Sequence, residues 1–218
     1  DNFVSYSWKA NGAGSSNTDG DVTTTVSANA AAGFSIVKFN LSNLTSTSTL
    51  GHGLNSAPKV IIVKNLVNSD DWYTYHYKVG AGSYVRFNDT AASSSSAGWM
   101  NSSTAPTDQV FTQTSTFWGT ANQDMVAYCF SSVDGYQAFG GYRGTAGAGA
   151  TVNCFQYTGF RPRFIWIKSN SHSEQWSLYD AQRLGYNNKN NILYINSNAA
   201  EGVEDDNGIR IYANGFNP

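Results

Sequence analysis

Short runs of β-branched and aromatic residues recur along the whole chain, separated by clusters of Gly, Asn, Ser and Asp. Strands are typically bounded in this way, and the helical periodicity of about 3.6 residues is nearly absent. The pattern therefore predicts an all-β fold, either a sandwich or a barrel. We expect strands at residues 3–8, 34–39, 59–64, 72–77, 83–87, 110–112, 125–130, 136–142, 163–168, 176–179, 192–195 and 209–212.

The apolar pattern within two of these strands predicts their place in the fold. Residues 60–63 are continuously apolar, which is typical of a central strand buried on both faces. In residues 125–130 larger and smaller apolar side chains alternate, so we expect both faces of that strand to be covered. Residues 12–29 are rich in Gly, Ser, Thr and Asp instead, which favours a linker or an exposed loop.

Part of the sequence occurs twice. PKVIIVK at residues 58–64 matches PRFIWIK at residues 162–168 without a gap, and the shift is 104 positions. After a small insertion, YVRFN at residues 84–88 matches ILYIN at residues 192–196 with a shift of 108 positions. Repeated sequence usually reflects one structural unit used twice. We therefore predict an internal duplication that gives two tandem β-sandwich units of jelly-roll-like form.

The second copy of this unit is incomplete in the alignment. Repeat one closes with the strand expected at residues 125–130, and repeat two has no equivalent of it. Residues 3–8 show the same alternation of apolar side chains as that strand. Because an unpaired strand edge promotes aggregation, we expect residues 3–8 to pair into a sheet, in this chain or in a neighbouring copy. The expected domains are an N-terminal closing strand and linker (1–32), repeat one (33–134), and repeat two without its last strand (135–218).

Composition narrows the class of protein. Charged residues make up 13% of the chain, about half the usual share, so the surface is polar through hydroxyl and amide groups. Such a surface fits a protein outside a cell or on a particle better than a metabolic enzyme. The net charge of −2 and the pI near 5.9 provide no basic surface, so nucleic acid is not an expected partner. No apolar stretch approaches the roughly 20 residues that span a bilayer, so membrane insertion is not expected.

The two cysteines, Cys129 and Cys154, allow one disulfide or two free thiols. In the repeat alignment Cys154 falls on Leu50 and Cys129 on Ser7. Positions where Cys alternates with small or apolar residues favour free, buried thiols over a disulfide.

Seven segments spread over the chain carry a family resemblance. They are residues 3–9, 17–20, 24–28, 33–37, 51–54, 57–65 and 126–130. Together they resemble structural proteins of tailed bacteriophages, of the type frequent in marine phages. The resemblance implies a virion protein with repeated β units, such as a tail-fibre, tail-associated or capsid-surface component. Its implied partners are other copies of itself and other virion proteins, and its implied location is the virion.

The chain has few residues with which to build a catalytic site. It contains three histidines, two cysteines and 15 acids, whereas catalysis needs titratable groups that converge. His52 lies between two glycines, where its ring is expected to cap backbone groups of a turn. There is no pair of histidines at metal-ligand spacing, no Cys-x-x-Cys, no Gly-x-Ser-x-Gly and no phosphate-binding loop. We expect no enzymatic activity and no cofactor.

Two weaker possibilities involve the carboxylates. Glu204, Asp205 and Asp206 are weak candidates for a Ca²⁺ site, because they do not fit the EF-hand loop pattern. A glycan depolymerase would need two carboxylates about 5–10 Å apart. The acids to examine for such a pair are Asp70, Asp71, Glu174 and Asp180.

Aromatic residues are the richer signal. Trp99 and Trp118 lie in Ser-, Thr- and Asn-rich segments and have no counterpart in repeat two. They are candidates for stacking on sugar rings or for a subunit interface, and the alternative is a loop folded back onto its own sandwich. We expect a non-catalytic virion protein that acts in assembly, surface presentation or host adhesion. The alternatives are a carbohydrate-binding module used for adsorption to host surface glycan, and a glycan depolymerase.

Overall fold

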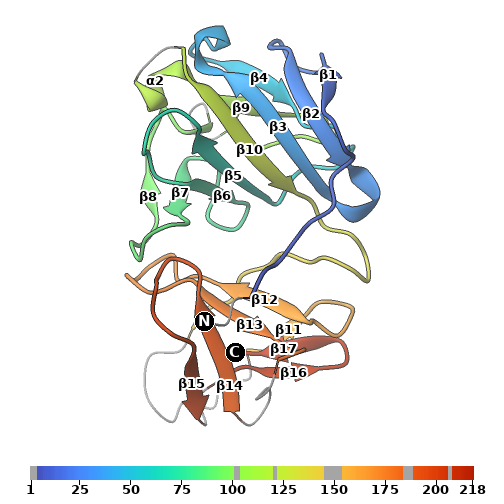
Figure 1. Ribbon diagram of the computed structural model, residues 1–218, viewed down its shortest axis with the longest axis vertical. Coiled ribbons are helices and arrows are strands. Elements are labelled where there is room, and N and C mark those ends of the chain that lie inside the picture. Colours follow the sequence, from blue (N-terminus) through green and yellow to red (C-terminus); the bar gives the residue numbers. More distant parts are fainter. Residues whose placement is uncertain (1–3, 101–103, 120–121, 145–153, 184–188, 206–207) are drawn as a thin grey trace. The chain divides into compact units, whose positions relative to one another are not determined.

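The computed structural model describes residues 4–100, 104–119, 122–144, 154–183, 189–205 and 208–218. This part of the chain is all-β, as the sequence pattern predicted, and its paired strands run antiparallel in several sheets. The chain divides into two compact units (Figure 1). Unit 1 comprises Asp1–Val85 with Ser94–Val133, and unit 2 comprises Arg86–Ser93 with Asp134–Pro218.

The larger sheet of unit 1 has eight strands in the order β1-β2-β3-β10-β5-β6-β7-β8. β10 lies in its interior, between β3 and β5, although it is the last of these strands in the sequence (Figure 1). The strands are β1 Ser15–Asn17, β2 Thr24–Asn29, β3 Phe34–Asn40, β5 Val60–Asn65, β6 Tyr73–His76, β7 Ser83–Arg86, β8 Ser94–Ser95 and β10 Asp124–Phe130.

A second layer covers one face of this sheet. β4 (Ser48–Gly51) pairs with β9 (Val110–Gln113), and Leu50 and Phe111 from these strands are fully buried. They share one core with apolar side chains of β2, β3, β5 and β10, so unit 1 is sandwich-like. Short helical turns connect the strands: η1 Ala30–Ala32, η2 Leu41–Asn43 and α2 Ser115–Trp118.

Two predictions about strands in unit 1 are confirmed. All four residues of 60–63 are buried, and β5 lies between β10 and β6. In β10, Met125, Ala127 and Cys129 face the core with no exposed surface. The opposite face of β10 is also covered, because Phe130 packs against the ring of Phe34 at 5.0 Å.

Two other predictions about the N-terminal region are wrong. Residues 24–29 form β2 instead of a loop, because Thr24, Val26 and Ser27 are buried in the sandwich. Residues 4–8 adopt no strand in the structure, and Phe3 lies outside the described residues.

Unit 2 contains two smaller sheets and a core formed by four isoleucines with Tyr179 and Ala181. The four-stranded sheet has the order β12-β13-β14-β15, and the three-stranded sheet has the order β11-β17-β16. Residues 136–142, which the sequence predicted to be a strand, form none, and Tyr136 is exposed. The strands are β11 Gln156–Tyr157, β12 Phe164–Ile167, β13 Ser177–Asp180, β14 Lys189–Tyr194, β15 Gly202–Asp205, β16 Arg210–Tyr212 and β17 Gly215–Asn217.

The segment 86–93 follows β7 in the sequence but belongs to unit 2. The ring of its Phe87 packs edge-on against the rings of Trp166 and Trp176, with centroid distances of 5.4 Å and 5.1 Å. The indole Nε1 of Trp176 donates a hydrogen bond of 2.8 Å to the carbonyl of Arg86. Unit 2 is therefore completed by a segment from the first half of the sequence.

The first hairpins of the two repeated segments have the same register. In β5–β6, Val60 pairs with His76. In β12–β13, Phe164 pairs with Asp180, and both residue numbers are 104 higher. The shift of 104 positions that aligns the two sequences therefore also relates the paired residues of the two hairpins.

The second hairpins agree in the same manner. In β7–β8, Ser83 pairs with Ser95. In β14–β15, Asn191 pairs with Val203, and both residue numbers are 108 higher. The strands β5-β6-β7-β8 and β12-β13-β14-β15 thus share their order and the registers of both hairpins.

Candidate functional site

The structure places Trp99 and Trp118 together in the core of unit 1. Trp99 has no exposed surface, and Trp118 is 9% exposed. The centroid of the Trp99 ring lies 5.2 Å from that of Phe117 and 5.8 Å from that of Tyr84. The ring of Tyr73 contacts both tryptophans. We call these five residues the aromatic cluster. The segments that carry Trp99 and Trp118 are therefore folded back onto the sandwich of unit 1. Neither tryptophan presents an indole face to a sugar ring.

Thr114 connects the segment that carries Trp99 with the start of α2, which carries Phe117 and Trp118. Its hydroxyl donates to the carbonyl of Gly98 at 2.6 Å, directly before Trp99. The same oxygen accepts from the backbone N–H of Phe117 at 3.3 Å, which caps α2. The indole of Trp118 is also satisfied, since its Nε1 donates to Gln113 Oε1 at 3.0 Å.

The two histidines of unit 1 serve turns of the backbone. His52 Nδ1 accepts from the N–H of Leu54 at 3.2 Å, and Nε2 lies 3.3 Å from the carbonyl of Thr107, to which it donates in that tautomer. The cap predicted for His52 is therefore confirmed, and burial lowers its pKa. His76 Nδ1 accepts from the N–H of Lys78 at 3.2 Å, and burial, reinforced by the nearby Lys78 charge, lowers its pKa to about 4.

Carboxylates in both units bind neighbouring groups in turns. Asp70 Oδ2 accepts from the amide of Asn65 at 2.6 Å. Asp180 Oδ1 accepts from the backbone N–H of Gln182 at 2.8 Å. These bonds give each of the two carboxylates a local role in a turn.

The metal candidates lie on β15 and just after it. Glu204 and Asp205 end β15, and Asp206 lies outside the described residues. Among the residues whose side chains the structure describes, which do not include Glu204 and Asp205, no three His, Cys, Asp or Glu side chains are grouped so that they could hold a metal ion. Cys129 and Cys154 are free thiols, as predicted, although only Cys129 is fully buried.

An exposed aromatic surface lies elsewhere, on the three-stranded sheet of unit 2. Tyr157 and Tyr212 both pair with Gly215, from opposite sides, so the two tyrosines project to one face of the sheet. Phe155 lies two residues before Tyr157 and shares that face. The exposed fractions are 72% for Tyr157, 43% for Tyr212 and 37% for Phe155. We call these three residues the aromatic face.

Gly215 allows the rings of the aromatic face to meet. A Cβ at this position would lie 2.7 Å from Cζ of Phe155 and would press on the carbonyl oxygen of Gln156. The Phe155 ring therefore occupies the space above the glycine. It also meets the Tyr212 ring edge-on, with ring centroids 5.8 Å apart and planes inclined at 64°.

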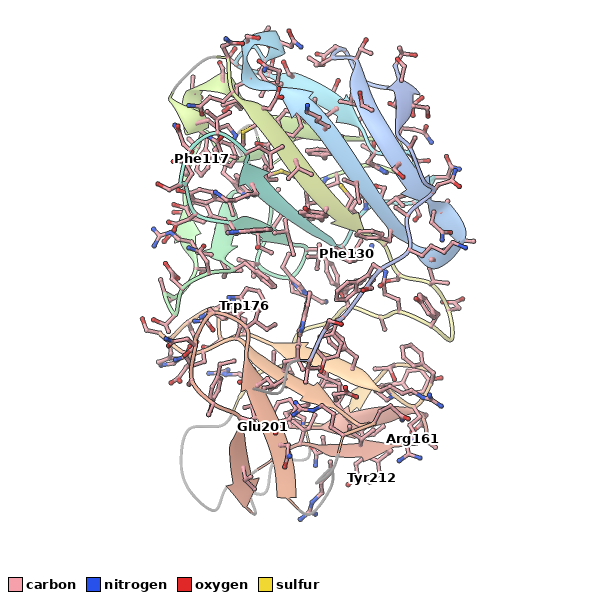
Figure 2. The ribbon with its side chains drawn as sticks, viewed as in Figure 1. Phe117, Phe130, Arg161, Trp176, Glu201 and Tyr212 are labelled. Carbon is pink, nitrogen blue, oxygen red and sulfur yellow. The ribbon has the colours of Figure 1, made fainter. Side chains whose placement is uncertain are left out.

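The aromatic face combines ring surfaces with polar groups. Arg210 is exposed and lies on the same face of the sheet as Tyr212, which is labelled in Figure 2. Aromatic rings stack on the C–H faces of sugars, and hydroxyl and guanidinium groups hydrogen-bond to sugar hydroxyls. A surface of this composition is chemically suited to contact a glycan.

Sequence reasoning missed this surface, although one signal pointed to it. With the shift of 104 positions, Phe155 falls on Gly51 and Tyr157 falls on Gly53. Two exposed aromatics of unit 2 therefore align with glycines in the sequence comparison.

A family model described as "Domain of unknown function (DUF7483)" matches residues 1–218. No curated protein and no solved structure shows significant similarity to the chain. None of the helices in the part of the chain that the structure describes has the length and apolar character needed to cross a bilayer.

Proposed function

We propose that this chain, which belongs to the DUF7483 family over its full length, is a non-catalytic structural protein of a tailed-phage virion. Its proposed place is the tail fibre, another tail-associated part or the capsid surface. It acts there in assembly and in presenting a surface to the host. The segments that resemble phage structural proteins, the low content of charged residues and the structural roles of the acids support this proposal.

We further infer that the two units contain copies of one ancestral four-stranded element. The matching registers of β5–β8 and β12–β15 support this inference. Each hairpin also has one further backbone hydrogen bond at the equivalent place. Tyr77 N donates to Lys59 O at 2.9 Å, and Ala181 N donates to Arg163 O at 2.7 Å, with both residue numbers 104 higher. Repeated β units are typical of proteins that build extended surfaces.

The aromatic face is the single observation that best supports the proposed role in surface presentation. Tyr157 exposes 72% of its surface, which is far more than a tyrosine that completes a core. Exposed tyrosines beside polar groups are common binding residues, because a rigid ring supplies contact area at low entropic cost. This observation also favours the second candidate function, a carbohydrate-binding module that the virion uses for adsorption.

The test is binding of the purified chain to host cells and to an array of bacterial surface glycans. We expect Tyr157→Ala and Tyr212→Ala each to weaken binding by about 30-fold, which corresponds to about 2 kcal/mol at a binding hot spot. Tyr136→Ala is the matched control, because Tyr136 is 59% exposed in unit 2 but lies outside the aromatic face. Unchanged binding by folded Tyr157→Ala, or an equal loss in Tyr136→Ala, would remove the aromatic face as the binding surface.

A further inference from the structure

Arg210 is the one charged residue in the strands of the three-stranded sheet, which read QY, RIY and GFN. It lies two residues before Tyr212 on β16, so both side chains project to the same face of the sheet. Arg210 is exposed, as are Tyr212 and Tyr157 on that face. The aromatic face therefore has a positive charge beside it, and its strands contribute no carboxylate that would balance this charge.

The strand register orders these groups in two rows. Tyr157, Gly215 and Tyr212 form one row across β11, β17 and β16 (Figure 1). Asn217 and Arg210 are paired in the next row. Residues two apart on one strand are separated by about 7 Å, and neighbouring strands by about 5 Å. A ligand that covers the tyrosines therefore lies within reach of the long Arg210 side chain.

Tyr157 offers this ligand an open ring. A Cβ at Gly159 would lie 3.7 Å from the hydroxyl oxygen of Tyr157 and 3.9 Å from its Cε1, so the ring lies beside this glycine. Because glycine has no side chain, the neighbour leaves the ring uncovered, and 72% of Tyr157 is exposed. An open ring of this kind stacks on the C–H face of a sugar.

The donors of Arg210 are not used by its neighbours in the described part of the chain. Its cross-strand partner Asn217 has a buried Oδ1 that accepts no hydrogen bond, so the guanidinium does not bond to it. Among the described residues no carboxylate forms an ion pair with Arg210, whereas Arg86 of the same unit pairs with Asp89 at 2.9 Å. A guanidinium carries five N–H donors in a planar fork that matches two oxygens of a carboxylate or a phosphate.

We propose that the aromatic face binds an anionic glycan, in which Arg210 pairs with an oxyanion of the sugar while Tyr157 and Tyr212 contact its rings. The oxyanion is a carboxylate or a phosphate, because the planar guanidinium binds either group through two hydrogen bonds. Charge complementarity carries the inference, since the strands of this sheet present one cation and no anion. The inference rests on the carbohydrate-binding role proposed for the aromatic face, and it names the class of glycan.

The experiment is isothermal titration calorimetry of the full chain with pairs of oligosaccharides that differ only in charge. One pair is tetragalacturonic acid and its carboxyl-reduced, neutral form, and the other is a mannose oligosaccharide with and without phosphate. We expect the charged member of at least one pair to bind about 10-fold more tightly, and Arg210→Gln to bind both members of that pair equally. Raising the salt concentration should weaken binding of the charged member alone, because salt screens an exposed charge pair.

Two further substitutions of arginine sharpen the test. Arg163→Gln is the matched control, because Arg163 is exposed in unit 2 but precedes β12 of the other sheet, and it should keep the preference for the charged member. Arg210→Lys keeps the charge and loses the planar fork, so it should retain the salt dependence and only part of the preference. Equal affinity of the unmodified chain for both members of each pair, no binding to any of the four oligosaccharides, or the same loss in Arg163→Gln would overturn the inference.

Tyr157→Ala separates this inference from the role on which it rests. We expect Tyr157→Ala to weaken binding of charged and neutral oligosaccharides alike, whereas Arg210→Gln affects the charged ones alone. If Tyr157→Ala weakens both and Arg210→Gln weakens neither, the aromatic face binds glycans without selecting charge, and this inference alone fails. If neither substitution changes binding, the carbohydrate-binding role of the aromatic face fails with it.

Discussion

Truncation of Trp99 tests whether the aromatic cluster is part of the core. Its ring has no exposed surface and contacts the rings of Tyr73, Tyr84, Phe117 and Trp118 at centroid distances of 5.2 to 6.4 Å. Trp99→Ala removes these contacts and leaves a cavity in unit 1. Trp99→Phe keeps an aromatic ring in the same place.

The expected losses in the free energy of unfolding follow from the burial of the Trp99 ring and from its unpaired Nε1. Replacing a buried tryptophan by alanine lowers the free energy of unfolding by about 3–5 kcal/mol. Trp99 Nε1 is buried and has no hydrogen-bond partner in the structure. Leaving such a donor unpaired costs about 1–3 kcal/mol, and phenylalanine removes it. We therefore expect Trp99→Phe to lose less than about 2 kcal/mol, because this gain offsets part of the lost packing.

The assay is urea unfolding followed by far-ultraviolet circular dichroism, with Tyr157→Ala as the control. Tyr157 is 72% exposed, so its substitution is expected to change stability by less than about 0.5 kcal/mol. Trp99→Ala with the same urea midpoint and slope as the unmodified chain would refute the burial of the indole. A Trp99→Phe variant as unstable as Trp99→Ala would refute the contribution of the unpaired Nε1.

Three further predictions concern pH, thiol chemistry and the glycine beneath the aromatic face. Because the pKa of His76 is about 4 in the folded chain and about 6.5 when unfolded, the unfolded state binds more protons between these values. The free energy of unfolding should therefore fall by about 3 kcal/mol as pH drops from 6.5 to 4, and His76→Gln should remove this part of the fall in urea titrations. Burial raises the pKa of Cys129 to about 12, so Ellman's reagent should modify Cys154 alone in the native chain and both thiols in denaturant; two fast-reacting native thiols would contradict the structure. Gly215→Ala should displace the ring of Phe155 and reduce glycan binding with unit 1 still folded, and normal binding by this variant would contradict the packing described.

The sequence predicted the central strands well, because their burial is visible in their composition. Residues 60–63 are apolar on both faces, and β5 indeed lies between two strands. β2 was missed because two of its buried side chains are polar. Thr24 Oγ1 donates to the carbonyl of Gly51, and Ser27 Oγ donates to the carbonyl of Gly12, so tertiary hydrogen bonds replace the apolar signal.

The candidate site was harder to predict, because local composition does not show which way a segment folds. Trp99 lies in a Ser-rich segment that reads as a surface loop, yet the hydrogen bond from Thr114 to Gly98 fixes it against the core. Tyr157 and Tyr212 are 55 positions apart and meet across Gly215 only when three strands pair. Such long-range pairing follows from the whole sheet and not from any short stretch of sequence.

The measurement that tests the proposed virion role most directly is immunogold electron microscopy of intact phage particles purified from cultures in which this chain is made, with antibodies raised against the purified protein. We expect gold at one defined surface of the particle, on the tail or on the capsid, and no gold on particles incubated with antibodies that were first absorbed with the chain. Purified infectious particles that carry neither the label nor peptides of this chain in mass spectrometry would contradict a structural role in the virion.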